Sequence, residues 1–371
     1  MSIRILHVVG KMHYGGMETL IMNLYRHIDR EKVQFDFLVH YQEKGDYDDE
    51  IRTLGGKIYV MPRTQIYNLK KYIRALHSFF RQHNEYAAVH GHLIRTAFLY
   101  HPIAKKYGIP VCITHAHNNK IEHNPKSCLG YLLAKLSIPY TDIFFSCSDE
   151  AGRFYFGRHF NQKKYFLIKN GIESADYRFN AEVRKAYRKR FGLDHSFVIG
   201  HIGRMAVQKN HKFLIRIFKS IYERCPNAKL VLIGDGSLKH IIVEQIQNEG
   251  LQNAVLVLGK RSDIPQLLQM IDVFVLPSLF EGLGIVLVEA QAAGVKSFAS
   301  ADVIPKLVQI TPDLSFVSLK EVPEVWAEEI LKYQNGYDHS DNVELVKESG
   351  FDIAATAKWL QDFYMQSNMG V

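Results

Sequence analysis

The segment Glu281-Gly-Leu-Gly-Ile-Val-Leu-Val-Glu289 decides how the rest of this chain is interpreted. Two carboxylates lie eight residues apart and enclose a Gly-x-Gly turn followed by an apolar run. The apolar segment Val273–Leu276 and the turn Pro277-Ser278 come directly before it. A strand, a glycine turn and a helix in this order place the free N–H groups of the helix at the carboxyl end of a sheet. Open α/β folds bind phosphorylated ligands at that position.

Apolar segments with the length of strands recur along the whole chain, with helical stretches between them. Continuous Val, Ile, Leu and Phe runs separated by amphipathic helices are typical of buried parallel sheets. Two such series in succession predict an α/β protein with two Rossmann-like domains. The expected strands are Ile3–Val9, Val33–Val39, Lys57–Met61, Ala87–His92, Val111–His115, Ile143–Ser146, Tyr165–Lys169, Phe197–Ile202, Ala228–Ile233, Ala254–Leu258, Val273–Leu276, Val295–Ala299 and Leu314–Val317.

The boundary between the two series is expected at Asn170-Gly171-Ile172, ahead of a charged helical stretch at 180–191. The predicted domains are therefore 1–170 and 171–352. The tail Ile353–Phe363 carries apolar residues at helical spacing and predicts a final amphipathic helix.

Composition supports two domains and suggests an anionic partner. The chain has 371 residues, of which 47% are hydrophobic and 23% charged, enough for two cores. No apolar run approaches the ~20 residues of a membrane helix, and the chain starts with a strand rather than a signal peptide, so we expect a cytoplasmic protein.

Residues 1–170 carry a formal charge of +10 and residues 171–371 carry −2. The basic part is expected to meet an acidic membrane surface, a lipid-diphosphate acceptor or nucleic acid. Nucleic acid is the least favoured, because no RNA-binding signature is present.

Two cations follow the first strand of the second series, in Gly203-Arg204-Met-Ala-Val-Gln-Lys209-Asn210. Arg204 and Lys209 could converge on a diphosphate whose other side faces backbone N–H groups. A diphosphate leaving group gains charge as it departs, and two fixed cations can neutralise that charge without a metal. The alternative is a cationic loop at a domain edge.

Glycine-rich turns follow two other strands. Gly234-Asp-Gly236 is at least as well explained by a strand-ending turn as by contact with a ligand. Gly15-Gly16-Met-Glu18 opens the first expected helix, where paired glycines permit a ligand to approach the backbone. This N-terminal loop matches neither a P-loop nor a GxGxxG fingerprint.

Two histidine pairs lie at strand ends, His90-Gly-His92 and His115-Ala-His117. Residues i and i+2 of a strand point to the same side, so each pair could chelate a metal ion. No acidic third ligand lies nearby in the sequence, and we therefore expect no zinc site. The alternative is that His115 or His117 meets a reacting group.

For two further motifs, the surrounding sequence indicates a structural role. Asp46-Tyr-Asp48 matches the metal-binding DxD pattern, but acids follow it as in the first turn of a helix, where they complement the helix dipole. The basic stretch 68–81 has an apolar side and predicts an ordinary helix packed on the core. A helix lying on a membrane surface is the minority interpretation of that stretch.

The motifs together resemble the signature of the retaining, GT-B-type glycosyltransferases of family 4, the type that builds bacterial capsules and exopolysaccharides. The elements that carry the resemblance are Gly203-Arg204 with Lys209, and Glu281 to Glu289. The Gly15-Gly16-x-Glu18 loop and Asn170-Gly171-Ile172 support it. Asn210 departs from the family pattern, which has a second glycine there. The segment 300–307 departs as well, because it lacks the usual Gly-Gly turn and Pro-Glu.

The resemblance implies an enzyme with an acceptor-binding first domain and a nucleotide-sugar-binding second domain, and a final helix at about 353–371 that crosses back to the first domain. It implies transfer with retention of configuration and no metal cofactor. Arg204 and Lys209 would bind the diphosphate, Glu289 the ribose, and Glu281 the transferred sugar. The residues implicated in donor binding are Arg204, Lys209, Gly234, Gly282, Leu283, Gly284 and Glu289. Those implicated in catalysis are His115, His117 and Glu281, with Gly15, Gly16 and Glu18 in the cleft loop.

The expected activity is transfer of a hexosyl or N-acetylhexosaminyl unit from a nucleotide-diphosphate sugar to a lipid-linked or polysaccharide-precursor acceptor. The expected location is the cytoplasm, with peripheral contact to the inner face of the cell membrane. Two alternatives stay open. One is a non-catalytic GT-B subunit that binds a membrane or a partner enzyme, and the other is a sugar-nucleotide epimerase that needs no acceptor.

Overall fold

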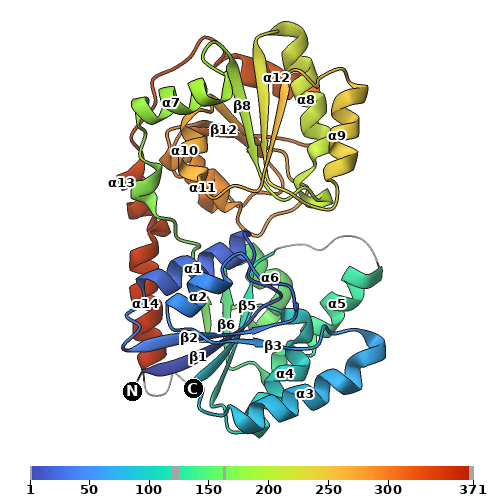
Figure 1. Ribbon diagram of the computed structural model, residues 1–371, viewed down its shortest axis with the longest axis vertical. Helices are drawn as coiled ribbons and strands as arrows, with labels where there is room; N and C mark the ends of the chain where they lie inside the picture. The colour runs from blue at the N-terminus through green and yellow to red at the C-terminus, as the bar shows by residue number, and fades with distance from the viewer. Residues whose placement is uncertain (1, 119–124, 162–163, 367–371) are drawn as a thin grey trace. The chain divides into compact units, whose positions relative to one another are not determined.

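The computed structural model describes residues 2–118, 125–161 and 164–366, and it divides the chain into two compact units (Figure 1). Unit 1 comprises Met1–Gly171 together with Ile353–Val371, and unit 2 comprises Ile172–Asp352. Within the described residues, no helix combines the length and the hydrophobicity needed to cross a bilayer. Each unit is described by itself below.

Unit 1 is built on a seven-stranded sheet in which all neighbouring strands are parallel. The strand order is β3-β2-β1-β4-β5-β6-β7, so the order reverses between β1 and β4. Open α/β sheets bind ligands at the carboxyl ends of strands beside such a reversal. The strands are β1 (Ile3–Val8), β2 (Val33–Val39), β3 (Ile58–Val60), β4 (Ala88–Gly91), β5 (Val111–Ala116), β6 (Ile143–Ser146) and β7 (Tyr165–Leu167).

Helices cover both faces of this sheet. One face packs against α1 (Gly16–His27), α2 (Asp48–Thr53) and the C-terminal helix α14 (Ile353–Met365). The other face packs against α3 (Leu69–Gln82) and α4 (Ile94–Lys106). The unit also contains α5 (Pro125–Lys135) and α6 (Asp149–Phe156). Because side chains alternate along a strand, β1, β2, β4 and β5 each supply apolar residues to both of these faces.

Unit 2 repeats the design with a six-stranded parallel sheet in the order β10-β9-β8-β11-β12-β13. Its strands are β8 (Phe197–Ile202), β9 (Ala228–Ile233), β10 (Val255–Gly259), β11 (Val273–Leu276), β12 (Lys296–Ser300) and β13 (Leu314–Val317). One face packs against α8 (His211–Arg224), α9 (Lys239–Asn248) and α12 (Pro323–Leu331). The remaining helices are α7 (Ala181–Phe191), α10 (Ile264–Gln269), α11 (Ile285–Ala292) and α13 (Val343–Val346). The order reverses between β8 and β11.

The predicted fold class is confirmed, and all thirteen predicted strands are present with shifts of one or two residues at some ends. The C-terminal helix α14 packs on α1 within unit 1, as the resemblance implied. The basic helix α3 buries Tyr72, Leu76, Phe79 and Phe80 in the core of unit 1. Its apolar side is therefore covered by the protein, and the minority interpretation of a membrane-surface helix is wrong for that side.

Candidate functional site

The carboxyl ends of β8 and β11 bring together the two loops that the sequence singled out. These strands are direct neighbours in the sheet of unit 2, at its reversal of strand order. The amide of Asn210, after β8, donates to the carbonyl oxygen of Pro277, after β11, at 3.1 Å. The backbone N–H of Leu279 donates to the carbonyl of Gln208 at 2.8 Å. The two loops are thus joined by side-chain and backbone hydrogen bonds.

An ion pair between Lys209 and Glu281 lies at the centre of this arrangement. The Lys209 Nζ atom lies 2.6 Å from Glu281 Oε1, and both side chains are largely buried. The Ser278 hydroxyl donates to the same carboxylate at 2.8 Å, and the Gln208 amide donates to its other oxygen at 3.2 Å. A buried carboxylate needs several donors to offset its loss of hydration, and Glu281 has three.

Glycine and asparagine shape the loop that holds Lys209. A Cβ atom on Gly203 would lie 2.9 Å from Lys209 Cε, so the lysine stem lies directly against this glycine. Asn210 has φ 54° and ψ 43°, in the left-handed region. Asparagine is among the few residues that adopt this conformation readily. This explains why Asn210 can stand where the family pattern has glycine.

Glu289 projects from α11 toward the same charge. It is partly exposed, and burial raises the pKa of its carboxyl to about 7. A hydrogen bond from the Tyr177 side chain and the positive charge of Lys209 act in the opposite direction. Gly284 caps α11 with φ 80°, a conformation that favours glycine, and Gly282 and Leu283 are buried beside it. A carboxyl group with a pKa near neutrality is typical of a binding or catalytic site.

Arg204 and Lys209 differ in their surroundings. Arg204 is exposed, and no hydrogen bond or ion pair of its side chain occurs among the described residues. Lys209 is instead held by Glu281. Of the two predicted diphosphate ligands, one is open to solvent and the other is fixed by a buried acid.

The turn at Gly234 has a structural function. Its φ is 135°, and a Cβ atom there would lie 2.1 Å from the carbonyl oxygen of Gly203. Backbone hydrogen bonds join Met205 to Asp235 and Leu238 to Met205. Gly234 therefore allows the turn after β9 to pack directly on the Gly203 loop and to support it.

Replacing Gly234 with alanine should destabilise unit 2 by about 3 kcal/mol, because both the backbone conformation and the contact with Gly203 exclude a Cβ atom. Gly192 is the matched control, since its φ is also positive, at 66°, but nothing lies within 4 Å of its Cβ position. Alanine at Gly192 should cost only about 1 kcal/mol. Urea denaturation of the two variants measures the difference, and equal losses would show that the loop contact is unimportant.

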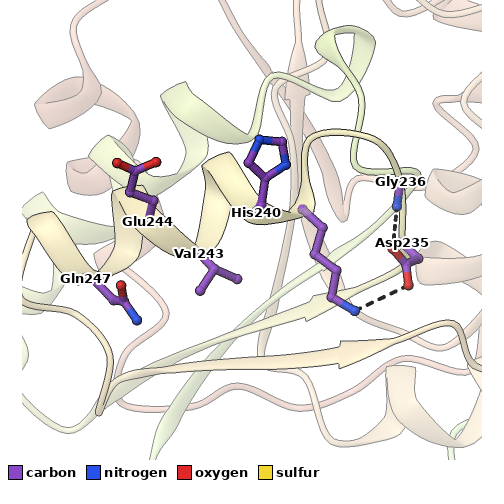
Figure 2. Close-up of a pocket in the computed structure, with 7 residues that line it drawn as sticks. Asp235, Gly236, His240, Val243, Glu244 and Gln247 are labelled. Carbon is purple, nitrogen blue, oxygen red and sulfur yellow. Dashed lines mark hydrogen bonds and ion pairs between the residues drawn. The ribbon is translucent and has the colours of Figure 1, made fainter.

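A depression of about 560 Å³ lies along α9 (Figure 2). Its lining residues are Asp235, Gly236, Lys239, His240, Val243, Glu244 and Gln247. Of the segments described above, the turn after β9 contributes Asp235 and Gly236 to this lining. Neither Lys209, Glu281 nor Glu289 lines it, so it adds nothing to the chemistry of those residues.

Unit 1 brings His115 and His117 into a larger group. The Nδ1 atom of His92 lies 2.8 Å from Nε2 of His117, and Nε2 of His90 lies 3.2 Å from Nδ1 of His115. His7, on β1, joins them through a contact of 3.0 Å with His92. His7 was not among the residues predicted from the sequence, although a histidine inside the apolar run Ile3–Val8 was a visible signal.

The loop that contains Gly15 and Gly16 is exposed at the start of α1, and Glu18 lies in the first turn of that helix. The carboxylate of Asp46 accepts from the backbone N–H of Tyr14 at 3.0 Å. Asp48 begins α2, as expected for the acidic start of a helix. The DxD motif thus serves the structure of this loop and of α2.

Comparison with known proteins identifies the family. The model described as Glycosyltransferase Family 4 matches residues 14–176, and the model described as Glycosyl transferases group 1 matches residues 183–342. EpsF of Bacillus subtilis (strain 168), named as a glycosyltransferase, is 36% identical over 335 residues, which cover 89% of this chain and 87% of EpsF. The chain belongs to the family 4 glycosyltransferases.

One further relative and one solved structure are also similar to this glycosyltransferase. The UDP-Gal:alpha-D-GlcNAc-diphosphoundecaprenol alpha-1,3-galactosyltransferase of Escherichia coli is 27% identical over 325 residues, which cover 81% of this chain and 79% of that enzyme. The crystal structure of Anabaena HepE in complex with UDP and glucose superposes with a TM-score of 0.79 at 17% identity, over 97% of this chain and 98% of HepE. The two parallel sheets and this superposition show the GT-B fold.

Proposed function

We propose that this glycosyltransferase moves a hexosyl or N-acetylhexosaminyl unit from a nucleotide-diphosphate sugar to a lipid-linked or polysaccharide-precursor acceptor, with retention of configuration. The observation that carries the proposal is the Lys209–Glu281 ion pair with Glu289 beside it, at the carboxyl ends of β8 and β11. This is the position at which open parallel sheets bind nucleotides.

Lys209 and Arg204 would bind the diphosphate. During transfer, the bond from the anomeric carbon to the diphosphate oxygen breaks and a bond to the acceptor oxygen forms. The proton of the acceptor hydroxyl passes to an oxygen of the departing diphosphate or to water, and negative charge develops on the diphosphate as it takes the electron pair of the broken bond. Fixed cations stabilise that charge more in the transition state than in the bound donor, which accelerates the reaction. Because Lys209 is already held by Glu281, it needs little reorganisation, and no metal is required for this role.

The carboxylates would recognise the sugars of the donor. Glu289, in the middle of α11, would accept hydrogen bonds from the ribose hydroxyls, and Glu281 would bind hydroxyls of the transferred sugar. His115 or His117 would position the reacting centre, and the loop with Gly15, Gly16 and Glu18 would line the acceptor side. In this assignment unit 1 binds the acceptor and unit 2 binds the donor.

A uridine nucleotide is the favoured donor. The Escherichia coli relative is named for UDP-Gal as donor, and HepE was crystallised with UDP. The same relative is named for a diphosphoundecaprenol-linked acceptor, which supports a lipid-linked acceptor here. The basic charge of residues 1–170 fits such an acceptor and peripheral contact with an anionic membrane.

The test is donor turnover with and without acceptor. The purified protein is incubated in EDTA with UDP-glucose, UDP-galactose or UDP-N-acetylglucosamine, and with an undecaprenyl-diphosphate-linked sugar. Release of UDP that requires the acceptor supports the proposal. Conversion of the donor without acceptor would instead establish an epimerase, and no consumption of any donor would favour a non-catalytic subunit.

A further inference from the structure

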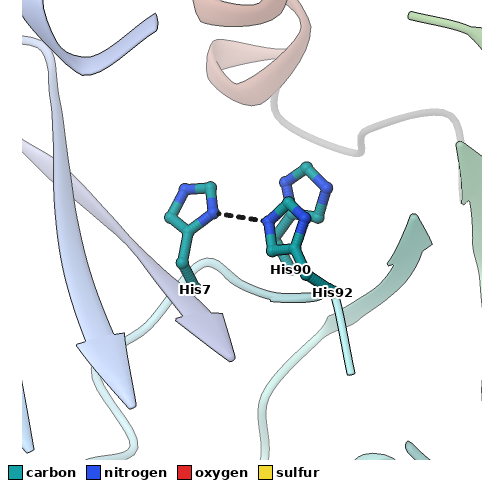
Figure 3. Close-up of side chains that lie close together, drawn as sticks. All are labelled: His7, His90 and His92. Atoms are coloured by element: carbon teal, nitrogen blue, oxygen red, sulfur yellow. Dashed lines mark hydrogen bonds between the residues drawn. The ribbon is translucent and has the colours of Figure 1, made fainter. Parts of the chain in front are cut away.

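Five histidines from three neighbouring strands gather in unit 1 at the reversal of strand order. Their side chains lie on the sheet face that α1 and α14 cover, because alternate residues of a strand share a face. His7 on β1 and His90 on β4 are direct partners in the strand register. Figure 3 shows the rings of His7, His90 and His92 side by side. The cluster is completed by His115 and His117.

The ring nitrogens of the cluster have the spacing of metal ligands. Zinc–nitrogen bonds of about 2.0–2.1 Å in a tetrahedral site place ligand nitrogens roughly 3.3 Å apart. In this cluster Nδ1 of His92 lies 2.8 Å from Nε2 of His117. One nitrogen from each of His92, His115 and His117 can be chosen so that all three lie within 4.8 Å of one another.

Several ring nitrogens in the cluster lack a hydrogen-bond partner although they are buried. These atoms are Nε2 of His7, Nε2 of His115 and Nδ1 of His117. A buried polar atom without a partner costs free energy, so such atoms point to a missing ligand.

We propose that His92, His115 and His117 form a binding site for one divalent transition-metal ion such as Zn²⁺. His117 is partly exposed, whereas the other four histidines of the cluster are buried. An ion can therefore enter at His117, and a fourth coordination position is left for water. The site shares His115 and His117 with the proposed function, which assigns one of them to the reacting centre, but metal binding is measured without donor or acceptor and so is tested separately.

The surrounding side chains fit outer-shell roles. His7 Nδ1 lies 3.0 Å from Nε2 of His92 and can accept its proton, which leaves Nδ1 of His92 free for the metal. His90 has the corresponding position beside His115, because its Nε2 atom lies 3.2 Å from Nδ1 of His115. The other ring nitrogen of His90, Nδ1, lies 2.6 Å from the Tyr364 hydroxyl. The alternative set of His7, His90 and His92 is wholly buried, whereas the proposed set includes the partly exposed His117.

Cobalt titration tests the site. The full chain is stripped with EDTA, desalted and titrated with Co²⁺, whose visible absorption reports nitrogen coordination, and Zn²⁺ is then used to displace it. The expected result is one Co²⁺ per chain. His117→Gln and His92→Gln should each lower the affinity at least 10-fold, and His7→Asn should lower it about 10- to 100-fold through the outer shell.

The control is His201→Asn in unit 2. His201 is also buried with a partnerless Nε2, but it lies outside the cluster, so its variant should bind Co²⁺ as the parent does. Circular dichroism checks that each variant is folded, and the partly exposed His117 is the safest position to change. The proposal is overturned if the parent protein takes up no stoichiometric Co²⁺, or if His117→Gln binds it as tightly as the parent.

Discussion

Replacing Lys209 with alanine is expected to lower turnover by about 10²- to 10³-fold, which corresponds to ~3–4 kcal/mol of transition-state stabilisation. The reason is that Lys209 is a cation fixed in advance by Glu281, so its charge acts on the departing diphosphate with little reorganisation. Steady-state kinetics with a UDP-sugar and a lipid-linked acceptor measure the effect. The loss should fall on kcat, because the interaction strengthens as the leaving group gains charge.

Lys219→Ala is the matched control for this variant. Lys219 also forms an ion pair of 2.6 Å, with Glu249, but on the surface of α8 and away from the loops after β8 and β11. Its loss should leave turnover within a factor of two. The Lys209 variant must also be shown to be folded, because Glu281 loses one donor and, among the described residues, keeps Ser278 and Gln208. A folded Lys209→Ala protein with near-normal kcat would remove the diphosphate assignment.

Replacing Glu289 with glutamine should stabilise the protein at high pH and leave it unchanged at low pH. The folded-state pKa of about 7 lies above the ordinary value of 4.5, so the folded protein binds the proton more tightly than the unfolded chain. The stability linked to this proton is fully present below about pH 4.5 and is lost as the pH rises through 7. Glutamine mimics the protonated form. We expect the variant to be more stable at pH 8 by on the order of 2 kcal/mol, after allowing for partial exposure.

Melting temperatures of the two proteins at pH 5 and pH 8 test this expectation. Glu244→Gln on α9 is the control, because that carboxyl is exposed and its replacement should matter little at either pH. The same Glu289→Gln change should weaken UDP binding about 10-fold at pH 8, since the ribose hydroxyls lose a charged acceptor. A residue whose replacement raises stability while it lowers binding has the trade-off typical of a functional site. Equal stability of both proteins at pH 8 would contradict the raised pKa.

The sequence predicted the fold well because its signals are local. Thirteen apolar runs of strand length and the helices between them were visible, and buried parallel sheets follow from them. The loops after β8 and β11 were also identified. The sequence did not predict that Lys209 and Glu281 pair with each other, because the strand order that makes β8 and β11 neighbours is a property of the folded sheet.

Long-range register also explains what was missed in unit 1. The two histidine pairs were recognised, but a third ligand was sought among acids nearby in the sequence. The folded sheet brings the two pairs together, and β1 and β4 also align His7 with His90, a neighbour that the sequence alone does not place there. Asn210 is a different case. The sequence showed that asparagine stands where the family has glycine, but only the structure shows the left-handed φ that asparagine adopts there readily.

Titration of UDP into the protein by calorimetry, in the presence of EDTA, tests the central claim most directly. The account predicts that one UDP binds per chain without metal, that Lys209→Ala weakens binding at least 10-fold, and that Lys219→Ala does not. UDP that binds only after Mg²⁺ is added, or that binds equally well to the Lys209 variant, would contradict a metal-free donor site at the carboxyl ends of β8 and β11.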